Sequence, residues 1–213
     1  MKKPDPITSE VRFLAGPVAM EYRTAGDAES APVAFVGNAI VCNTRSLNLG
    51  GFVEVIDPKA LDDADLSDVV GVFNHNNDVL LGRNTSDTLQ LTRSEDGGLS
   101  YRIAYDALDS DHVRVLRKIT RGDVVGSSFA FRIPAGGDTW VEEPESDDKC
   151  YLRTIYKISK VSDVGPVTSP AYADSTAAKR SLGHFLETPI TPPPAPSTVP
   201  LALRKRQQEQ YSL

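Results

Sequence analysis

The residues of this chain that could carry out chemistry are two adjacent serines, one histidine upstream of them and several acids downstream. Ser127 and Ser128 follow Gly126 at the start of an apolar segment, and His75 precedes them in the chain. A serine nucleophile, a histidine that takes its proton and an acid that orients the histidine are the groups that a serine hydrolase needs. The sequence therefore predicts acyl-transfer chemistry and leaves the serine open between the two.

The chain has 3 histidines from which a base can be chosen. His75 follows the apolar run 69–73 and lies where a strand leaves the core, a usual position for a catalytic group. His112 falls in the first turn of a predicted helix, where we expect a solvated side chain, and His184 lies near the tail. Position alone favours His75 as the base.

The third member of the site must come from the acids that follow the serines. Asp163 is isolated in the apolar-flanked segment 158–167, where a buried carboxylate would need a partner. A turn aspartate with no role explains it equally well at this stage. The other acids lie in a charged stretch that favours a solvated loop: Glu142, Glu143, Glu145, Asp147 and Asp148.

Two common hydrolase plans do not fit the serine segment. Its Gly-x-Ser-x-Ala pattern is close to the nucleophile elbow, but that elbow joins a strand to a helix and precedes its acid and histidine. Here strand-like sequence, Phe129 to Ile133, follows the serines. The Gly-Asp-Ser-Gly context of trypsin-like enzymes is also absent.

The elements that must position these groups are mostly strands. Alternating or continuous apolar segments bounded by Gly, Asn and Asp predict a β-rich core. Asp109 or Ser110 can cap a helix over 110–121 that Gly122 ends, and Pro58 opens a shorter helix over 60–66. We expect strands at 18–22, 34–42, 51–56, 69–73, 79–81, 89–92, 99–105, 124–133 and 151–158, with a polar excursion over 134–149.

Composition limits the function classes. A chain of 213 residues, 40% hydrophobic and 24% charged, can bury one sizeable core beside a long appendage. A net charge of −6 argues against binding to nucleic acid or to an anionic membrane. Cys42 and Cys150 suggest neither a disulfide framework nor a metal site, which favours a reducing, intracellular setting. We expect no export signal, no membrane span and no cofactor.

The end of the chain differs in character from the rest. Residues 173–186 can form a short helix, and the proline-rich stretch 188–196 cannot sustain a helix or a sheet. We therefore expect an extended linker and tail.

Several motifs, taken in order, resemble those of the prohead maturation proteases of tailed bacteriophages. The resemblance covers roughly residues 10–178. The motifs are Gly37-Asn38-Ala39, Ser46 to Gly51, Phe52 to Ile56, Phe73-Asn74-His75, Val79 to Arg83, Gly98-Leu99, Arg121 to Val124, Gly126 to Phe131 and Val164 to Tyr172.

The resemblance implies a fold like that of the herpesvirus assemblin protease, a mainly antiparallel β-barrel with peripheral helices. It implies a serine endopeptidase in which His75, Ser128 and Asp163 are catalytic, so that it selects Ser128 over Ser127. The oxyanion donor is left open among backbone amides near Ser128, including that of Ser127, and Arg83. Two positions depart from the family pattern: Ala130, where Gly is commoner, and Asn76, where an aspartate is usual.

The resemblance also implies the biological setting. The protease domain spans 10–178, after a flexible N-terminus at 1–9 and before a disordered or self-cleaved linker and tail at 179–213. Its substrates would be a scaffold protein, or the scaffold region of the major capsid protein, and the protease itself, with a homodimer or higher assembly inside the prohead. The chain would act within the assembling procapsid in the host cytoplasm, or in a bacterial cytoplasm if encoded by a prophage. The alternative is a non-catalytic capsid-assembly scaffold module on the same fold.

Overall fold

The computed structural model describes residues 9–14, 18–23, 31–143, 150–168, 181–183 and 185–186. Its strands form three sheets. The five-stranded sheet has the order β1 (Ser9–Leu14), β9 (Gly126–Arg132), β12 (Lys160–Val167), β5 (Val70–Phe73) and β6 (Asn76–Arg83). The four-stranded sheet is β2 (Ala19–Arg23), β3 (Ala31–Ile40), β8 (Leu99–Ala104) and β7 (Leu89–Arg93), and the three-stranded sheet is β10 (Asp138–Glu143), β11 (Cys150–Ile155) and β4 (Phe52–Ile56).

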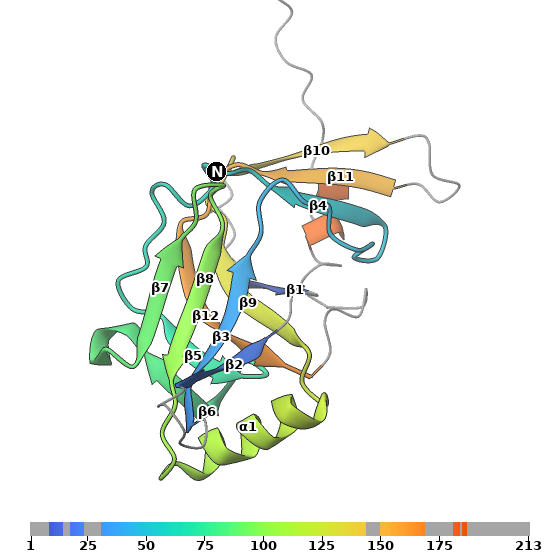
Figure 1. The fold of residues 1–213 in the computed structure, drawn as a ribbon. Coiled ribbons are helices and arrows are strands. Elements are labelled where there is room, and N and C mark those ends of the chain that lie inside the picture. Colours follow the sequence, from blue (N-terminus) through green and yellow to red (C-terminus); the bar gives the residue numbers. More distant parts are fainter. Residues whose placement is uncertain are drawn as a thin grey trace, which may run out of the picture.

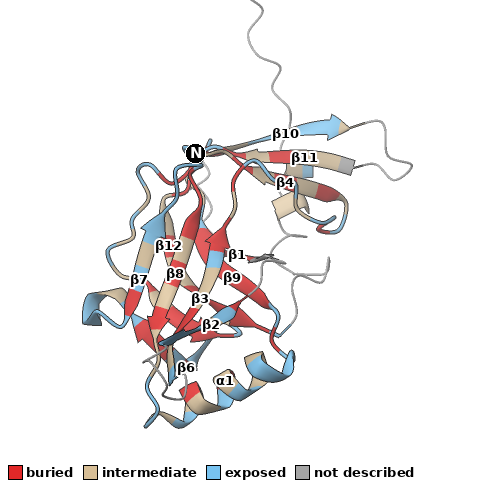
Figure 2. Ribbon diagram, in the orientation of Figure 1, coloured by how far each residue is buried: buried red, intermediate tan, exposed pale blue. Residues whose placement is uncertain are grey.

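The two larger sheets pack against each other, with the three-stranded sheet at one end and α1 (Ser110–Arg121) at the other (Figure 1). Their facing side chains form one continuous core, and Figure 2 shows buried residues along the strands of both sheets. Phe35 and Ile103 come from the four-stranded sheet, and Phe129 and Phe131 come from β9; all four are at most 1% exposed. This core holds β9, and hence both serines, in place.

The β-rich class predicted from the sequence is confirmed, and most strand pairings are antiparallel. Among the pairings between the described strands, only those of β11 with β4 and of β12 with β5 are parallel. The strands form separate sheets, and no closed barrel is found among them. The helix at 110–121 is also confirmed: Asp109 accepts hydrogen bonds from the amides of Asp111 and His112, and Gly122 ends the helix in the left-handed conformation.

The predicted helix over 60–66 is wrong. Successive turns replace it, because the carbonyl of Ala60 accepts a hydrogen bond of 2.7 Å from the amide of Ile158, which ties the segment to the strand region. The amide of Ala64, which would bond to Ala60 in a helix, bonds to Leu61 instead at 3.1 Å. A tertiary contact has therefore displaced the local helical preference.

Three strands were not predicted. β10 lies inside the expected polar excursion 134–149, where it pairs with β11, and the predicted strand 151–158 ends at Ile155. β12 follows as a separate strand at the centre of the five-stranded sheet, and β1 pairs with β9 at its edge. Polar and charged residues interrupt the apolar positions of all three strands, which weakens the strand signal in the sequence.

The part of residues 173–186 that the structure describes is helical, at 181–183 and 185–186. Leu182 packs beside Leu49 and Phe52, and the ring of Phe185 stacks on Trp140 with centroids 5.1 Å apart. This segment therefore lies on the three-stranded sheet. The predicted boundaries at 9–10 and 178–179 stay predictions, because 1–8 and most of 179–213 lie outside the described residues. In the part of the chain described, no helix is long and apolar enough to cross a bilayer.

The contact between β12 and β5 is unusually close at Gly165. A Cβ atom built on this residue would lie 1.9 Å from the carbonyl oxygen of Val72. Only glycine lets the two backbones approach this closely. The approach matters because β12 and β5 together frame the hairpin that carries His75.

We predict that Gly165→Ala lowers the free energy of unfolding by about 3 kcal/mol or more, because the new methyl group must push two paired strands apart. Chemical denaturation followed by circular dichroism measures the change. Gly183→Ala is the matched control, since a Cβ there meets nothing within 4 Å. Equal stabilities for the two variants would show that the close approach does not constrain the sheet.

Candidate active site

His75 lies in the two-residue turn between β5 and β6. Asn74 and His75 both have a φ of 55°, in the left-handed region that a type I′ hairpin turn requires at its two central positions. Asparagine tolerates this region well, and histidine tolerates it better than most residues do. The turn, and not the face of a strand, therefore sets the direction of the imidazole.

The end of β12 anchors this turn. The amide of Asn74 donates to the carbonyl of Pro166 at 3.1 Å, and the side-chain oxygen of Asn74 accepts from the amide of Thr168 at 2.9 Å. These bonds hold the left-handed pair against the strand that also carries Asp163. The histidine and the acid are thus positioned by the same strand.

A β-bulge directs Asp163. The pairing of β12 with β9 shifts register between Val161 and Asp163, so that Ser162 is the extra residue. In a regular strand Val161 and Asp163 would share a face, and Val161 is fully buried. The bulge releases Asp163 from that buried face, a common use of bulges beside functional sites.

The two serines point to opposite faces of β9, as neighbours in a strand must. The hydroxyl of Ser127 lies 3.0 Å from that of Tyr101 inside the core, and burial raises the pKa of Tyr101. Gly37 makes room for this pair, because a Cβ there would lie 2.5 Å from Ser127 Oγ. Ser128 is on the other face, toward the hairpin turn.

The structure brings Asp163, His75 and Ser128 into one hydrogen-bonded chain. His75 Nδ1 lies 2.6 Å from Asp163 Oδ1, and His75 Nε2 is hydrogen-bonded to Ser128 Oγ. Nδ1–H donates to the carboxylate, which turns the lone pair of Nε2 toward the serine when the ring is neutral. The three residues thus have the geometry of a nucleophile, a base and an orienting acid.

The other predicted residues have different surroundings. Arg83 forms a two-point ion pair with Asp68, with Nε and Nη2 at 2.7 and 2.6 Å from its carboxylate oxygens. Ala130 has no positive φ, so its methyl group is accommodated in β9. Asn76 accepts a hydrogen bond of 2.9 Å from the amide of Asp78.

The expectation that His112 is solvated is wrong, since the residue is only 5% exposed. Its ring packs beside Phe35 and Tyr105, and its Nδ1 accepts a hydrogen bond of 3.1 Å from the amide of Asp106. His112 therefore closes the core beneath α1. His184 lies outside the described residues.

Cys42 is also buried, at 6% exposed, and burial raises the pKa of its thiol to about 11. It therefore stays a neutral thiol at ordinary pH and is a poor nucleophile. Within the described ranges, no group of three or more His, Cys, Asp or Glu side chains is arranged to hold a metal ion.

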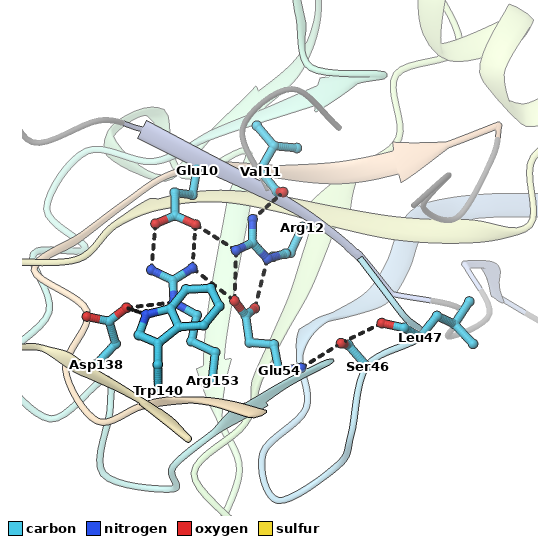
Figure 3. Close-up of polar contacts among 9 residues, drawn as sticks. All are labelled: Glu10, Val11, Arg12, Ser46, Leu47, Glu54, Asp138, Trp140 and Arg153. Carbon is cyan, nitrogen blue, oxygen red and sulfur yellow. Dashed lines mark hydrogen bonds and ion pairs between the residues drawn. The ribbon is translucent and has the colours of Figure 1, made fainter. Parts of the chain in front are cut away.

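Sequence reasoning missed a buried ion network that joins β1 to the three-stranded sheet (Figure 3). Glu10 and Arg12 of β1 meet Glu54 of β4 and Arg153 of β11, and all four side chains are less than 10% exposed. Arg12 binds both oxygens of Glu54 at 2.8 and 2.7 Å, and Arg153 binds both oxygens of Glu10 at 2.7 and 2.8 Å. The sequence did carry one signal of this network: a single charged residue lies within each of two apolar strands, Glu54 in β4 and Arg153 in β11.

The network includes further contacts in the three-stranded sheet, and it lowers the pKa of Glu10. Arg153 donates to Asp138 at 2.6 Å, and its guanidinium lies 5.1 Å from the ring centre of Trp140. Burial raises the pKa of Glu10, but the hydrogen bond from Arg153 and the charges of both arginines outweigh it and lower the pKa to about 2. Glu10 therefore remains ionised in the fold.

A comparison with family models decides the class of the protein. The model of the caudovirus prohead serine proteases matches residues 19–188 of the 213. The chain belongs to this family. A prohead serine protease is a hydrolase of phage capsid maturation, and the matched range contains His75, Ser128 and Asp163 but not β1. No curated protein and no solved structure matches the chain.

We predict that Glu10→Gln lowers the free energy of unfolding by about 3 kcal/mol near neutral pH. The substitution removes a negative charge that balances two buried arginines, Arg12 and Arg153. The folded-state pKa of Glu10 is below its ordinary value of 4.5, so its contribution is present above about pH 4.5 and is lost as pH falls toward 2. The difference between wild type and variant should shrink over the same range. Urea denaturation across pH measures it.

Glu95→Gln, at an exposed carboxylate outside the network, is the matched control. A difference between wild type and Glu10→Gln that does not change from neutral pH down to pH 2 would contradict the assigned role of Glu10.

Proposed function

We propose that the chain is a Ser-His-Asp endopeptidase that cleaves scaffold protein, or the scaffold region of the major capsid protein, and itself during prohead maturation. The observation that carries the proposal is the continuous hydrogen-bonded chain from Asp163 through His75 to Ser128. Family membership supports a protease of this setting. The three residues come from three different strands or turns, so their convergence is a property of the fold.

In the proposed mechanism, Ser128 Oγ attacks the carbonyl carbon of a substrate peptide while His75 Nε2 takes its proton. The protonated imidazole then donates that proton to the leaving amine, and an acyl-enzyme remains on Ser128. Water, deprotonated by His75, attacks the acyl carbon and releases the new carboxylate. Ser128 recovers its proton from His75 at the end of the cycle.

Asp163 orients the imidazole and stabilises its positive charge during both proton transfers. Its distance of 2.6 Å to Nδ1 suits this role, and both side chains are only 16–17% exposed, which limits screening by water. The bulge at Ser162 and the left-handed turn at His75 are the local features that make the contact possible.

For the oxyanion, backbone amides near Ser128, such as that of Ser127, are the better candidates. Arg83 is engaged by Asp68 in an exposed ion pair and would have to leave it to reach a substrate. Fixed backbone donors stabilise developing negative charge without such a rearrangement.

The fold is proposed to be of the herpesvirus assemblin type, and the protease to act as a homodimer or higher assembly inside the procapsid of the infected host cell. The proline-rich segment after residue 187 is proposed to be a self-cleaved or scaffold-tethering tail, because such segments are good protease substrates.

We predict that Ser128→Ala, His75→Ala and Asp163→Asn each reduce processing of a co-expressed capsid or scaffold protein by about a thousandfold or more. Mass spectrometry of the capsid proteins and of the protease itself measures this. Ser127→Ala is the matched control, since it keeps the backbone amide and removes only the hydroxyl that faces Tyr101.

If Ser128→Ala and wild type are processed identically, Ser128 is not the nucleophile, and the non-catalytic scaffold module becomes the better explanation. Loss of processing in Ser127→Ala with full processing in Ser128→Ala would reverse the choice between the serines.

A further inference from the structure

Strand β1 covers the candidate nucleophile. It is one of the two edge strands of the five-stranded sheet, and its pairing with β9 sets Phe13 opposite Ser128. Ser128 is fully buried, although the other two members of the site are partly exposed. Its Oγ lies 2.6 Å from the carbonyl oxygen of Arg12. A backbone carbonyl of the chain itself thus stands beside the serine, where a substrate carbonyl must stand.

This contact competes with catalysis for one proton. Ser128 has a single hydroxyl hydrogen and two neighbouring acceptors, Arg12 O and His75 Nε2. Donation to His75 begins the proposed attack, whereas donation to Arg12 directs the proton away from the base. While β1 is docked, the serine is both inaccessible and held in an unproductive hydrogen bond.

The side chains of β1 are also held as a bound peptide would be. Glu10 and Arg12 are two residues apart and therefore share a face of the strand. That face meets Arg153 and Glu54, which belong to the three-stranded sheet (Figure 3). Each charge of β1 finds a two-point partner of opposite sign, and Arg12 and Glu10 also bind each other at 2.6 Å.

The two partners are suited to receive a strand from elsewhere. Glu54 and Arg153 lie within the residues that match the family, whereas β1 precedes them. Without β1 they would still be neighbours, with Arg153 Nη1 at 3.1 Å from Glu54 Oε2. The edge of β9 would then be open to an extended peptide, which can add to a sheet edge by backbone hydrogen bonds.

We infer that β1 occupies the substrate groove, and that Glu54 and Arg153 select substrates with a basic residue whose carbonyl faces Ser128 and an acidic residue two positions before it. The inference rests on the proposed function. The residues of β1 form such a sequence, Glu10-Val11-Arg12, and act as an internal competitor. Being tethered, they compete at high effective concentration, so a substrate must displace them.

Chemical labelling of Ser128 by a fluorophosphonate tests the occupation of the groove. The phosphonate reacts only with an accessible, activated serine, so the rate follows the fraction of molecules in which β1 is displaced. In the full chain, Arg12→Ala should label about tenfold faster than wild type, and Arg12→Lys should fall between them. Circular dichroism reports whether each variant is folded, and Ser128→Ala is the unlabelled control.

Equal labelling of wild type and of a folded Arg12→Ala or Arg12→Lys chain would overturn the inference while leaving the nucleophile in place. Absence of labelling in every variant would instead count against the proposed function. The two failures are therefore distinguishable.

Peptide hydrolysis tests whether Glu54 and Arg153 select substrates by the order of their charged residues. The substrates are a peptide with the sequence of residues 8–16 and the same peptide with its Glu and Arg exchanged. Water adds across the bond after the basic residue, which gains a carboxylate while the next residue gains a free amine. In the Arg12→Ala chain, kcat/KM for the natural order should exceed that for the exchanged order by about thirtyfold.

Glu54→Gln, added to Arg12→Ala, should reduce this preference mainly through KM. Equal kcat/KM for the two peptides, or cleavage of neither by a chain whose Ser128 is labelled, would refute the assignment of Glu54 and Arg153 as selecting residues.

Discussion

The approach of β12 to β5 at Gly165 is the constraint on which the candidate site depends. At this point two backbones pack without an intervening side chain, and the carbonyl of Val72 fills the space that a methyl group would need. β12 pairs with β9 on its other side, so one strand sets the positions of the serine, the acid and the hairpin that carries the histidine. The site is therefore assembled by sheet geometry, with little contribution from long flexible loops.

Many of these elements can be predicted from the sequence. The features that cannot be predicted have physical reasons. The apolar alternation around Phe129 and Phe131 predicts β9, and the caps of the helix at 110–121 predict its limits. The direction of Asp163 is not predictable, because a one-residue bulge reverses the alternation after Val161. The choice of Ser128 over Ser127 likewise requires the faces of β9, which the sequence pattern alone leaves undecided.

The ion network was missed for a related reason. Glu54 and Arg153 lie in otherwise apolar strands, where a single charge is easily attributed to solvent exposure. Their burial is tolerable only because every charge meets an opposite one with two-point geometry, and those partners come from a strand more than forty residues away. Removing one partner of a buried ion pair is strongly destabilising, because the other charge is left buried without compensation. Such networks become evident only when distant strands are brought together.

The indole of Trp140 lies between two parts of the chain that are distant in sequence. Phe185 stacks on it at 5.1 Å, and the guanidinium of Arg153 lies 5.1 Å from the same ring while also holding Glu10 of β1. The chain contains 1 tryptophan. Its fluorescence emission consequently senses both the strand that precedes the family-matched range and the helical residues near the end of that range, so that one optical signal registers the release of either segment without an added label.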